Sequence, residues 1–300
     1  MARARWTHTT WLISVAVLPL IAGCATTSSA SDGVATDSTP NAVTTTTLSL
    51  PRDLPTTTVA RETTTTSSTT SVLPTFENEP AIISAMAEPL SAVGREDGEE
   101  TIRLQERLLE LGFWVQSTDG IFGLTTRQAV MAAQKYLGLP ATSSVDEATA
   151  EALSAATTRP LARSDRGTLV EIDKSLQLGF FVIDGETEWV LNVSTGSEIP
   201  YSEPNQNDPE KIEEGDSITD PGLFNVDRER AEGWWDGDLG SIYRPKYFNG
   251  GIAVHGSGSI PNYPASHGCV RVSTPAMDWI WENELMPMGT PVWVHGSIPR

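Results

Sequence analysis

The stretch that organises the chain spans residues 255–272 and reads His255-Gly-Ser-Gly-Ser-Ile-Pro-Asn-Tyr-Pro-Ala-Ser-His-Gly-Cys269-Val-Arg-Val272. It contains two of the four histidines and one of the two cysteines of the chain. A thiol is a strong nucleophile only as a thiolate, and a neighbouring imidazole is the usual group that takes its proton. The glycines between them let a substrate approach the backbone closely. The stretch therefore predicts a cysteine nucleophile with a histidine base.

The spacing around the cysteine suggests which side chains lie together. If residues 266–271 are extended, His267, Cys269 and Arg271 share one face, because side chains alternate along a strand. His255 follows a short apolar strand and is expected to point into the same cleft. Two imidazoles and a thiol would then surround one point.

The backbone beside the thiol adds a further function. The N–H groups of Gly268 and Cys269 are expected to bind an oxyanion. Two alternatives are a buried structural thiol and a zinc site formed by His255, His267 and Cys269. We expect neither, because glycine and histidine flank the thiol and no further cysteine or suitably spaced carboxylate supports a metal, so no metal or cofactor is predicted. His295 is expected to be a surface residue at a strand end.

Composition limits the class of protein. The 300 residues carry a formal net charge of −19, with a pI near 4.5. Nucleic acid requires a basic surface, so nucleic-acid binding is not expected. Electrostatic docking onto an anionic membrane is disfavoured for the same reason. The first third is poor in large apolar residues, so we expect two small domains on a tether, and a monomer.

The amino terminus has the features of an export signal. Residues 1–23 combine basic Arg3 and Arg5 with a short apolar run and small residues. The sequence Leu-Ile-Ala-Gly before Cys24 resembles a bacterial lipoprotein lipobox. This resemblance implies cleavage before Cys24, a lipid on its thiol, and retention at the outer face of a membrane or in the cell wall; an ordinary secretory signal is the alternative. Lipidation would leave Cys269 without a disulfide partner, which is unusual in an exported protein.

Residues 24–97 are expected to form a disordered tether. Up to about residue 75 they consist mainly of Thr, Ser, Pro and small residues, which cannot bury enough apolar surface to offset the entropy of ordering. Residues 76–97 are a transition in which a short helix around Ile82 and Met86 is one outcome and further linker is the other.

Residues 98–156 show helical periodicity, with helices expected over 100–111, 125–137 and 146–153. The unit contains the motifs Leu104-Gln105, Leu111-Gly112-Phe113, Asp119-Gly-Ile-Phe-Gly123, Thr126, Ala129-Val130, Gln134 and Gly138-Leu139-Pro140. With these motifs it resembles the peptidoglycan-binding type 1 domain, a small three-helix module. Ala133 and Ala150 stand where the family usually has Phe and often Trp. A helical spacer without a ligand is the alternative.

Residues 166–297 are expected to form a mainly β domain, a sandwich or irregular barrel with one helix. β-branched and aromatic runs predict strands over 168–173, 176–183, 189–193, 222–226, 251–254 and 291–294. A helix is expected from Pro275, with Thr274 as its N-cap. The acidic residues 201–217 are expected to form a loop.

This β domain resembles an L,D-transpeptidase catalytic domain of the YkuD type. The resemblance rests on His255-Gly256 and on Ser266-His267-Gly268-Cys269-Val270-Arg271. Ser194-Thr195-Gly196 and Thr219-Asp220-Pro221-Gly222-Leu223-Phe224 match two further family segments, the second imperfectly. The resemblance implies a peptidoglycan stem peptide as substrate, with glycan as a further partner.

The resemblance also implies roles. Cys269 attacks a stem tetrapeptide between its third residue and the terminal D-Ala, and an amine of a second stem resolves the thioester into a 3→3 crosslink. His255 is the base, its ring held by the carbonyl of Gly256. Ser266 and His267 shape the site, while Arg271 binds a substrate carboxylate.

Three functions remain open. The first is the transpeptidase, and the second is an L,D-carboxypeptidase or another peptide hydrolase that uses the same Cys/His site. The third is a wall-binding protein with an inactive catalytic domain. Geometry distinguishes the two histidines: a residue two positions from Cys269 on one strand has its side chain parallel to the thiol rather than converging on it. We therefore expect His255, not His267, to accept the proton.

Overall fold

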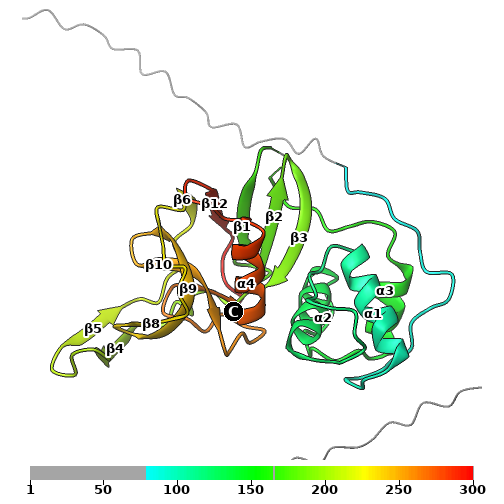
Figure 1. Ribbon diagram of the computed structural model, residues 1–300, viewed down its shortest axis with the longest axis horizontal. Helices are drawn as coiled ribbons and strands as arrows, with labels where there is room; N and C mark the ends of the chain where they lie inside the picture. Colours follow the sequence, from blue (N-terminus) through cyan, green and yellow to red (C-terminus); the bar gives the residue numbers. More distant parts are fainter. Residues whose placement is uncertain (1–78, 165, 300) are drawn as a thin grey trace, which may run out of the picture. The chain divides into compact units, whose positions relative to one another are not determined.

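The computed structural model describes residues 79–164 and 166–299 (Figure 1). The expected signal peptide, the lipobox and residues 24–78 of the expected tether lie outside this range. The described chain comprises a segment of residues 79–97, a helical module of residues 98–156 and a β domain of residues 166–297. The module contains α1 (Glu99–Glu110), α2 (Leu124–Tyr136) and α3 (Glu147–Ala155).

A buried glutamine holds the helical module together. The Gln105 side chain on α1 is 1% exposed. Its amide nitrogen donates to Asp119 Oδ1, to the Ile121 carbonyl and to Thr126 Oγ1, and its oxygen accepts from the Gly120 N–H. A buried amide is costly unless its groups are paired, so the turn at 119–121 must keep this conformation.

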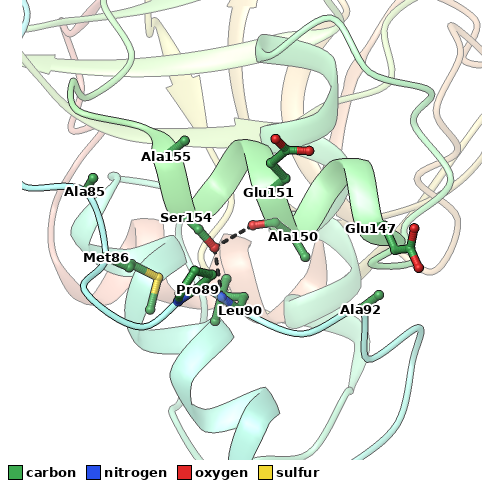
Figure 2. A pocket seen from close by; sticks show the side chains of 10 residues that line it. All are labelled: Ala85, Met86, Pro89, Leu90, Ala92, Glu147, Ala150, Glu151, Ser154 and Ala155. Atoms are coloured by element: carbon green, nitrogen blue, oxygen red, sulfur yellow. Dashed lines mark hydrogen bonds between the residues drawn. The ribbon is translucent and has the colours of Figure 1, made fainter.

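The segment before α1 packs onto α3. Met86 N–H donates to the Ser154 carbonyl, and Leu90 N–H donates to Ser154 Oγ at 2.8 Å. Ser154 Oγ itself donates to the Ala150 carbonyl, so one hydroxyl connects the segment to the helix (Figure 2). Residues 79–97 belong to the segment expected as a tether, and in the structure they form no helix but lie along the module.

Two five-stranded sheets form the body of the β domain. The first has the order β3-β2-β1-β12-β6, and the second has the order β11-β10-β9-β7, with β8 pairing to β9. The strands are β1 (Leu169–Asp173), β2 (Leu178–Ile183), β3 (Glu186–Asn192), β6 (Gly222–Asn225), β7 (Arg228–Glu229), β8 (Trp234–Gly237), β9 (Gly240–Asn249), β10 (Ile252–Ser257), β11 (Val270–Ser273) and β12 (Pro291–His295). The pairs β1–β12 and β10–β11 are parallel, and the others are antiparallel. The prediction of a mainly β domain with one helix behind a helical module is confirmed.

The core of the β domain lies between the two sheets. Val170 and Val292 of the first sheet join Val254 and Val270 of the second in one apolar cluster. Helix α4 (Thr274–Glu282) adds to this cluster and packs against β10. The N-cap of α4 is Ser273, whose side chain accepts from the Ala276 N–H, so the expected cap is displaced by one residue.

Two sequence expectations about this domain are wrong, and three strands were missed. The acidic segment 201–217 is not a plain loop but contains a hairpin of β4 (Tyr201–Pro204) and β5 (Ile212–Gly215). Strands β7, β8 and β9 were not expected. His295 is not a surface residue: it is 8% exposed, and its Nε2 lies 2.8 Å from Oε1 of the buried Glu171.

Strand β2 is buried on both faces. Phe181 belongs to the core between the sheets, whereas Leu178, Phe180 and Val182 belong to the apolar core of the helical module. This division follows from the period-two alternation of side chains, and it explains why the strand is apolar throughout. The helices therefore cover one face of the first sheet.

Backbone and aromatic contacts strengthen this junction. The chain after α1 pairs with β3, since Val190 N–H donates to the Gly112 carbonyl and Trp114 N–H donates to the Val190 carbonyl. The Trp114 ring packs on Trp279 of α4, with the ring centroids 5.0 Å apart. The module and the β domain therefore share an apolar core.

Polar contacts cross the junction as well. Lys135 Nζ on α2 donates to Asn192 Oδ1 on β3 at 2.5 Å, and Asn192 Nδ2 donates to Gln128 Oε1 at 2.7 Å. Gln128 Nε2 then donates to the Ile260 carbonyl, in the loop after β10. Burial lowers the pKa of Lys135 to about 7.

We predict that the helical module and the β domain unfold in one transition. Trp114→Ala should lower the free energy of unfolding by about 3–5 kcal/mol, the usual cost of removing a buried aromatic side chain. The variant should keep a single transition at a lower denaturant concentration, measured by chemical denaturation with fluorescence and circular dichroism.

The matched control is Ile121→Ala in the same module, because the Ile121 side chain is 57% exposed. Its effect should stay within about 0.5 kcal/mol. Two separate transitions in the wild-type protein, or a Trp114→Ala variant as stable as the control, would contradict the shared core.

Candidate active site

The parallel pairing of β10 and β11 brings the predicted site residues together. Val254 pairs with Val270, and His255 pairs with Arg271. Directly paired side chains point to the same face of a sheet, and Cys269 precedes Arg271 by two positions. His255, Cys269 and Arg271 all line one cleft, so the imidazole, the thiol and the guanidinium lie on the same side of the sheet.

His255 is buried and held by its neighbour's backbone. Its side chain is 4% exposed, and Nδ1 lies 2.8 Å from the Gly256 carbonyl. A carbonyl oxygen only accepts, so Nδ1 carries the proton and Nε2 keeps its lone pair. Burial lowers the pKa of His255 to about 4; the Gly256 carbonyl opposes this shift, and Arg271 adds to it. The imidazole is therefore neutral at physiological pH.

Cys269 lies directly before β11 and is partly exposed. Dense packing around the sulfur raises the pKa of the thiol, while a backbone hydrogen bond from Ala253 and the charge of Arg271 oppose this rise. Within the described residues, no hydrogen bond joins Sγ to His255; Sγ lies 3.7 Å from the Gly251 carbonyl oxygen. The resting pair is a neutral thiol and a neutral imidazole.

His267 does not share the face of Cys269. Gly268 has a φ of +135°, which bends the chain, and β11 begins only at Val270. The His267 ring instead packs on Tyr201 of β4, with ring centroids 4.7 Å apart, and its Nε2 lies 3.4 Å from Glu203 Oε1. The expectation of an extended segment over 266–271 is wrong, because a conformation accessible to glycine interrupts it.

The backbone N–H of Gly268 is already used. It donates to Ser266 Oγ at 3.0 Å, and Ser266 Oγ donates to the Cys269 carbonyl at 2.5 Å. The expectation that the Gly268 N–H binds an oxyanion is therefore corrected, since an internal hydrogen bond occupies this donor. Ser266 stabilises the turn that presents the cysteine.

Arg271 carries an uncompensated charge. No hydrogen bond or ion pair to its guanidinium occurs among residues 79–164 and 166–299. Burial lowers the pKa of Arg271, and the nearby Cys269 opposes this shift. A partly buried guanidinium without a carboxylate partner suits an anionic ligand group.

These side chains line a cleft of about 700 Å³. Its walls come from the loops and strands between β7 and β11 and from the β4–β5 hairpin, which lies beside β8 in Figure 1. The hairpin is tied to the β8–β9 turn, where Asn207 Nδ2 donates to Asp238 Oδ1. Besides the predicted residues, the lining includes Tyr201, Glu213, Arg228, Trp235, Asp236, Asp238 and Tyr247.

Sequence reasoning missed most of this lining. Trp235 was not among the predicted site residues, and it is 41% exposed in the cleft. The acidic segment offered no apolar alternation, so nothing in its pattern placed Tyr201 or Glu213 near the cysteine. Across the described ranges, no group of three or more His, Cys, Asp or Glu side chains is arranged to hold a metal ion. None of the helices described there is long and apolar enough to cross a membrane.

Comparison with known proteins agrees with this geometry. The YkuD family, described as the L,D-transpeptidase catalytic domain, matches residues 167–294, and a putative peptidoglycan-binding domain matches residues 97–153. No curated protein sequence gives a significant match. Among solved structures, an L,D-transpeptidase from Xylanimonas cellulosilytica is 42% identical, with a TM-score of 0.62. The match covers 68% of this chain and 98% of that one.

A second structure, an L,D-transpeptidase from Stackebrandtia nassauensis, is 21% identical with a TM-score of 0.39, and the match covers 71% of this chain and 99% of that one. The first relative, by contrast, combines high identity with a match over nearly its whole length. In this chain, most of the helical module and all the cleft residues lie within the regions that match the two families. The chain therefore belongs to the L,D-transpeptidase family, with a peptidoglycan-binding domain on the N-terminal side of its catalytic domain.

Proposed function

We propose that this protein is a peptidoglycan L,D-transpeptidase that forms 3→3 crosslinks through a thioester on Cys269. One observation carries the proposal: the β10–β11 register puts His255, Cys269 and Arg271 on one face of a cleft. Nucleophile, base and anion-binding group are thus available to one substrate.

Acylation begins with a proton transfer. The Nε2 lone pair of His255 accepts the thiol proton as Cys269 Sγ attacks the carbonyl between the third residue of a stem tetrapeptide and its terminal D-Ala. The backbone N–H of Cys269 stabilises the oxyanion. The C–N bond then breaks, His255 returns the proton to the leaving amine, and D-Ala departs. The acyl group remains on Sγ as a thioester.

Deacylation reverses the same proton path. An amine of a second stem peptide attacks the thioester and gives its proton to His255, which returns it to the departing sulfur. A new amide bond forms, the C–S bond breaks, and the free thiol is regenerated. With water in place of the amine, the same steps would give an L,D-carboxypeptidase.

The other side chains of the cleft bind and orient the substrate. Arg271 is assigned to a substrate carboxylate, since its guanidinium has no carboxylate partner among the described residues. Gly256 fixes the tautomer of His255, and a Cβ there would lie 2.9 Å from Tyr243 Cδ1. Ser266 holds the turn, and His267 supports the hairpin wall through Tyr201.

Placement at the cell wall is part of the proposal. The helical module belongs to a peptidoglycan-binding family, and we assign glycan as its partner. Cys24 is assigned as the lipidated residue that retains the protein at the outer face of the membrane, on the basis of its lipobox.

We predict that Cys269→Ala abolishes D-Ala release from a disaccharide tetrapeptide without loss of fold. His255→Ala should slow acylation by about 10²–10⁴-fold, the usual cost of losing a general base. His267→Ala is the matched control, because its ring packs on Tyr201 rather than on the reacting atoms, and its acylation rate should fall far less. Mass spectrometry of the products and of the acyl-enzyme measures all three.

The reaction products also distinguish a transpeptidase from a carboxypeptidase. A crosslinked dimer supports the transpeptidase, whereas tripeptide alone identifies a carboxypeptidase. Near wild-type turnover by Cys269→Ala would refute the nucleophile assignment. An acylation rate lost in His267→Ala but kept in His255→Ala would exchange the two roles.

The acylation rate should depend on pH through His255. Because burial lowers its pKa to about 4, the base is free to accept a proton at any pH well above that value. The rate of acylation by a carbapenem should therefore stay nearly constant from about pH 5.5 to 7.5 and fall on acidification through about pH 4, as the imidazole becomes protonated. An acid limb near pH 6.5, the value of an exposed histidine, would show that burial does not set this pKa.

Cys24→Ala should release the protein from membranes while the catalytic activity is retained, because Cys24 lies far from the catalytic domain in sequence. Fractionation of cells followed by immunodetection measures the release, and a carbapenem acylation assay on the released protein measures the activity. A variant that still sediments with lipid would contradict the lipoprotein assignment.

A further inference from the structure

A buried threonine lies behind the turn that carries Cys269. The Thr219 side chain is 0% exposed. Its Oγ1 accepts from the Gly196 N–H at 2.9 Å and lies 2.6 Å from the Gly268 carbonyl oxygen. A hydroxyl has one proton, and a carbonyl oxygen can only accept, so Thr219 donates to Gly268.

This contact fixes the orientation of one peptide unit. The Gly268–Cys269 bond is trans, like all peptide bonds of the described chain. In a trans peptide the C=O and the N–H point in opposite directions. Because the Gly268 carbonyl is bound to Thr219 in the interior, the Cys269 N–H must point away from Thr219.

The backbone around this peptide unit cannot easily relax. Gly268 has a φ of +135°, and a Cβ at this position would lie 2.8 Å from the Ile218 carbonyl oxygen. A Cβ on Gly196 would lie 2.0 Å from the Ser217 carbonyl oxygen. The segment 217–219 therefore packs directly on the two backbone stretches that Thr219 joins.

The Cys269 N–H is the donor that the turn leaves for a substrate. The Gly268 N–H donates to Ser266 Oγ, and the Cys269 carbonyl accepts from the same hydroxyl. With the Gly268 carbonyl taken by Thr219, three of the four polar groups of these two residues are bound within the turn and its support. An oxyanion formed on a substrate attacked by Sγ therefore has the Cys269 N–H as its donor from this turn.

We propose that Thr219 is a positioning residue of the reaction: its hydroxyl holds the Gly268–Cys269 peptide so that the Cys269 N–H stabilises the oxyanion formed during acyl transfer. The inference rests on the proposed acyl transfer at Cys269. Thr219 itself touches neither the substrate nor the reacting sulfur.

The test compares two reactions of the same thiol. Acylation by a carbapenem passes through an oxyanion, whereas alkylation by iodoacetamide displaces iodide and forms none. In Thr219→Val, which keeps the shape but lacks the hydroxyl, acylation should slow by about 10- to 100-fold, since the donor is misdirected rather than removed. Alkylation should change by no more than about twofold. The ratio of the two rates is the measurement.

Matched variants separate positioning from packing. Thr219→Ser keeps the hydroxyl and should restore most of the ratio. Thr195→Val removes another hydroxyl that is 0% exposed, but this one accepts from Gln177 Nε2, so the ratio should stay at the wild-type value. Thermal unfolding of each variant shows whether it is folded, and Thr219→Ala replaces Thr219→Val if the valine variant does not fold.

Every outcome bears on the inference. A ratio that falls in Thr219→Val or Thr219→Ala and returns in Thr219→Ser supports it. A ratio that stays constant would overturn it, whether or not both rates fall, because a purely structural role affects acylation and alkylation alike. Failure of the proposed function would look different: wild-type protein would be alkylated but not acylated.

Discussion

The parallel pairing of β10 with β11 is the constraint on which the site depends. A parallel pair cannot be joined by a tight turn, so the chain between the two strands must leave the sheet and return. The returning loop carries Ser266 and His267 and enters β11 just after Cys269. The register then fixes which side chains share a face. A shift by one residue would move His255 or Cys269 to the other face of the sheet.

The protonation states of His255 and Cys269 follow from burial rather than from an ion pair between them. Burial lowers the pKa of His255 and raises the pKa of Cys269, so both shifts favour the neutral forms. A backbone hydrogen bond from Ala253 and the charge of Arg271 oppose the rise in the pKa of Cys269 without cancelling it. In the proposed reaction the thiol would therefore lose its proton in concert with attack, and the resting thiol would react slowly with other electrophiles.

Local pattern made much of the fold predictable. The helix expected over 100–111 is α1, Glu99–Glu110, because apolar residues at helical spacing end at Gly112, which has a φ of +86°. The His255–Gly256 contact expected from the resemblance is present. The role of each site residue remains a prediction.

Contacts between distant residues were not predictable in the same way. The burial of His295 depends on Glu171, which is 124 residues away in sequence. The position of His267 depends on a bend at Gly268 and on a hairpin whose acidic sequence has no strand pattern. The support that Thr219 gives to Gly268 crosses 49 residues. Each of these contacts arises from tertiary packing, which the spacing of apolar residues within one segment does not predict.

The shared core of the helical module and the β domain limits how the protein would bind the proposed polymer substrate. A binding module on a flexible linker searches a volume, and its benefit is a raised local concentration. A module that buries Trp114 against Trp279 and pairs its backbone with β3 cannot search in this way. A glycan strand bound by the helices would lie at a fixed distance from Cys269. Only a stem peptide at that distance along the strand could then reach the thiol.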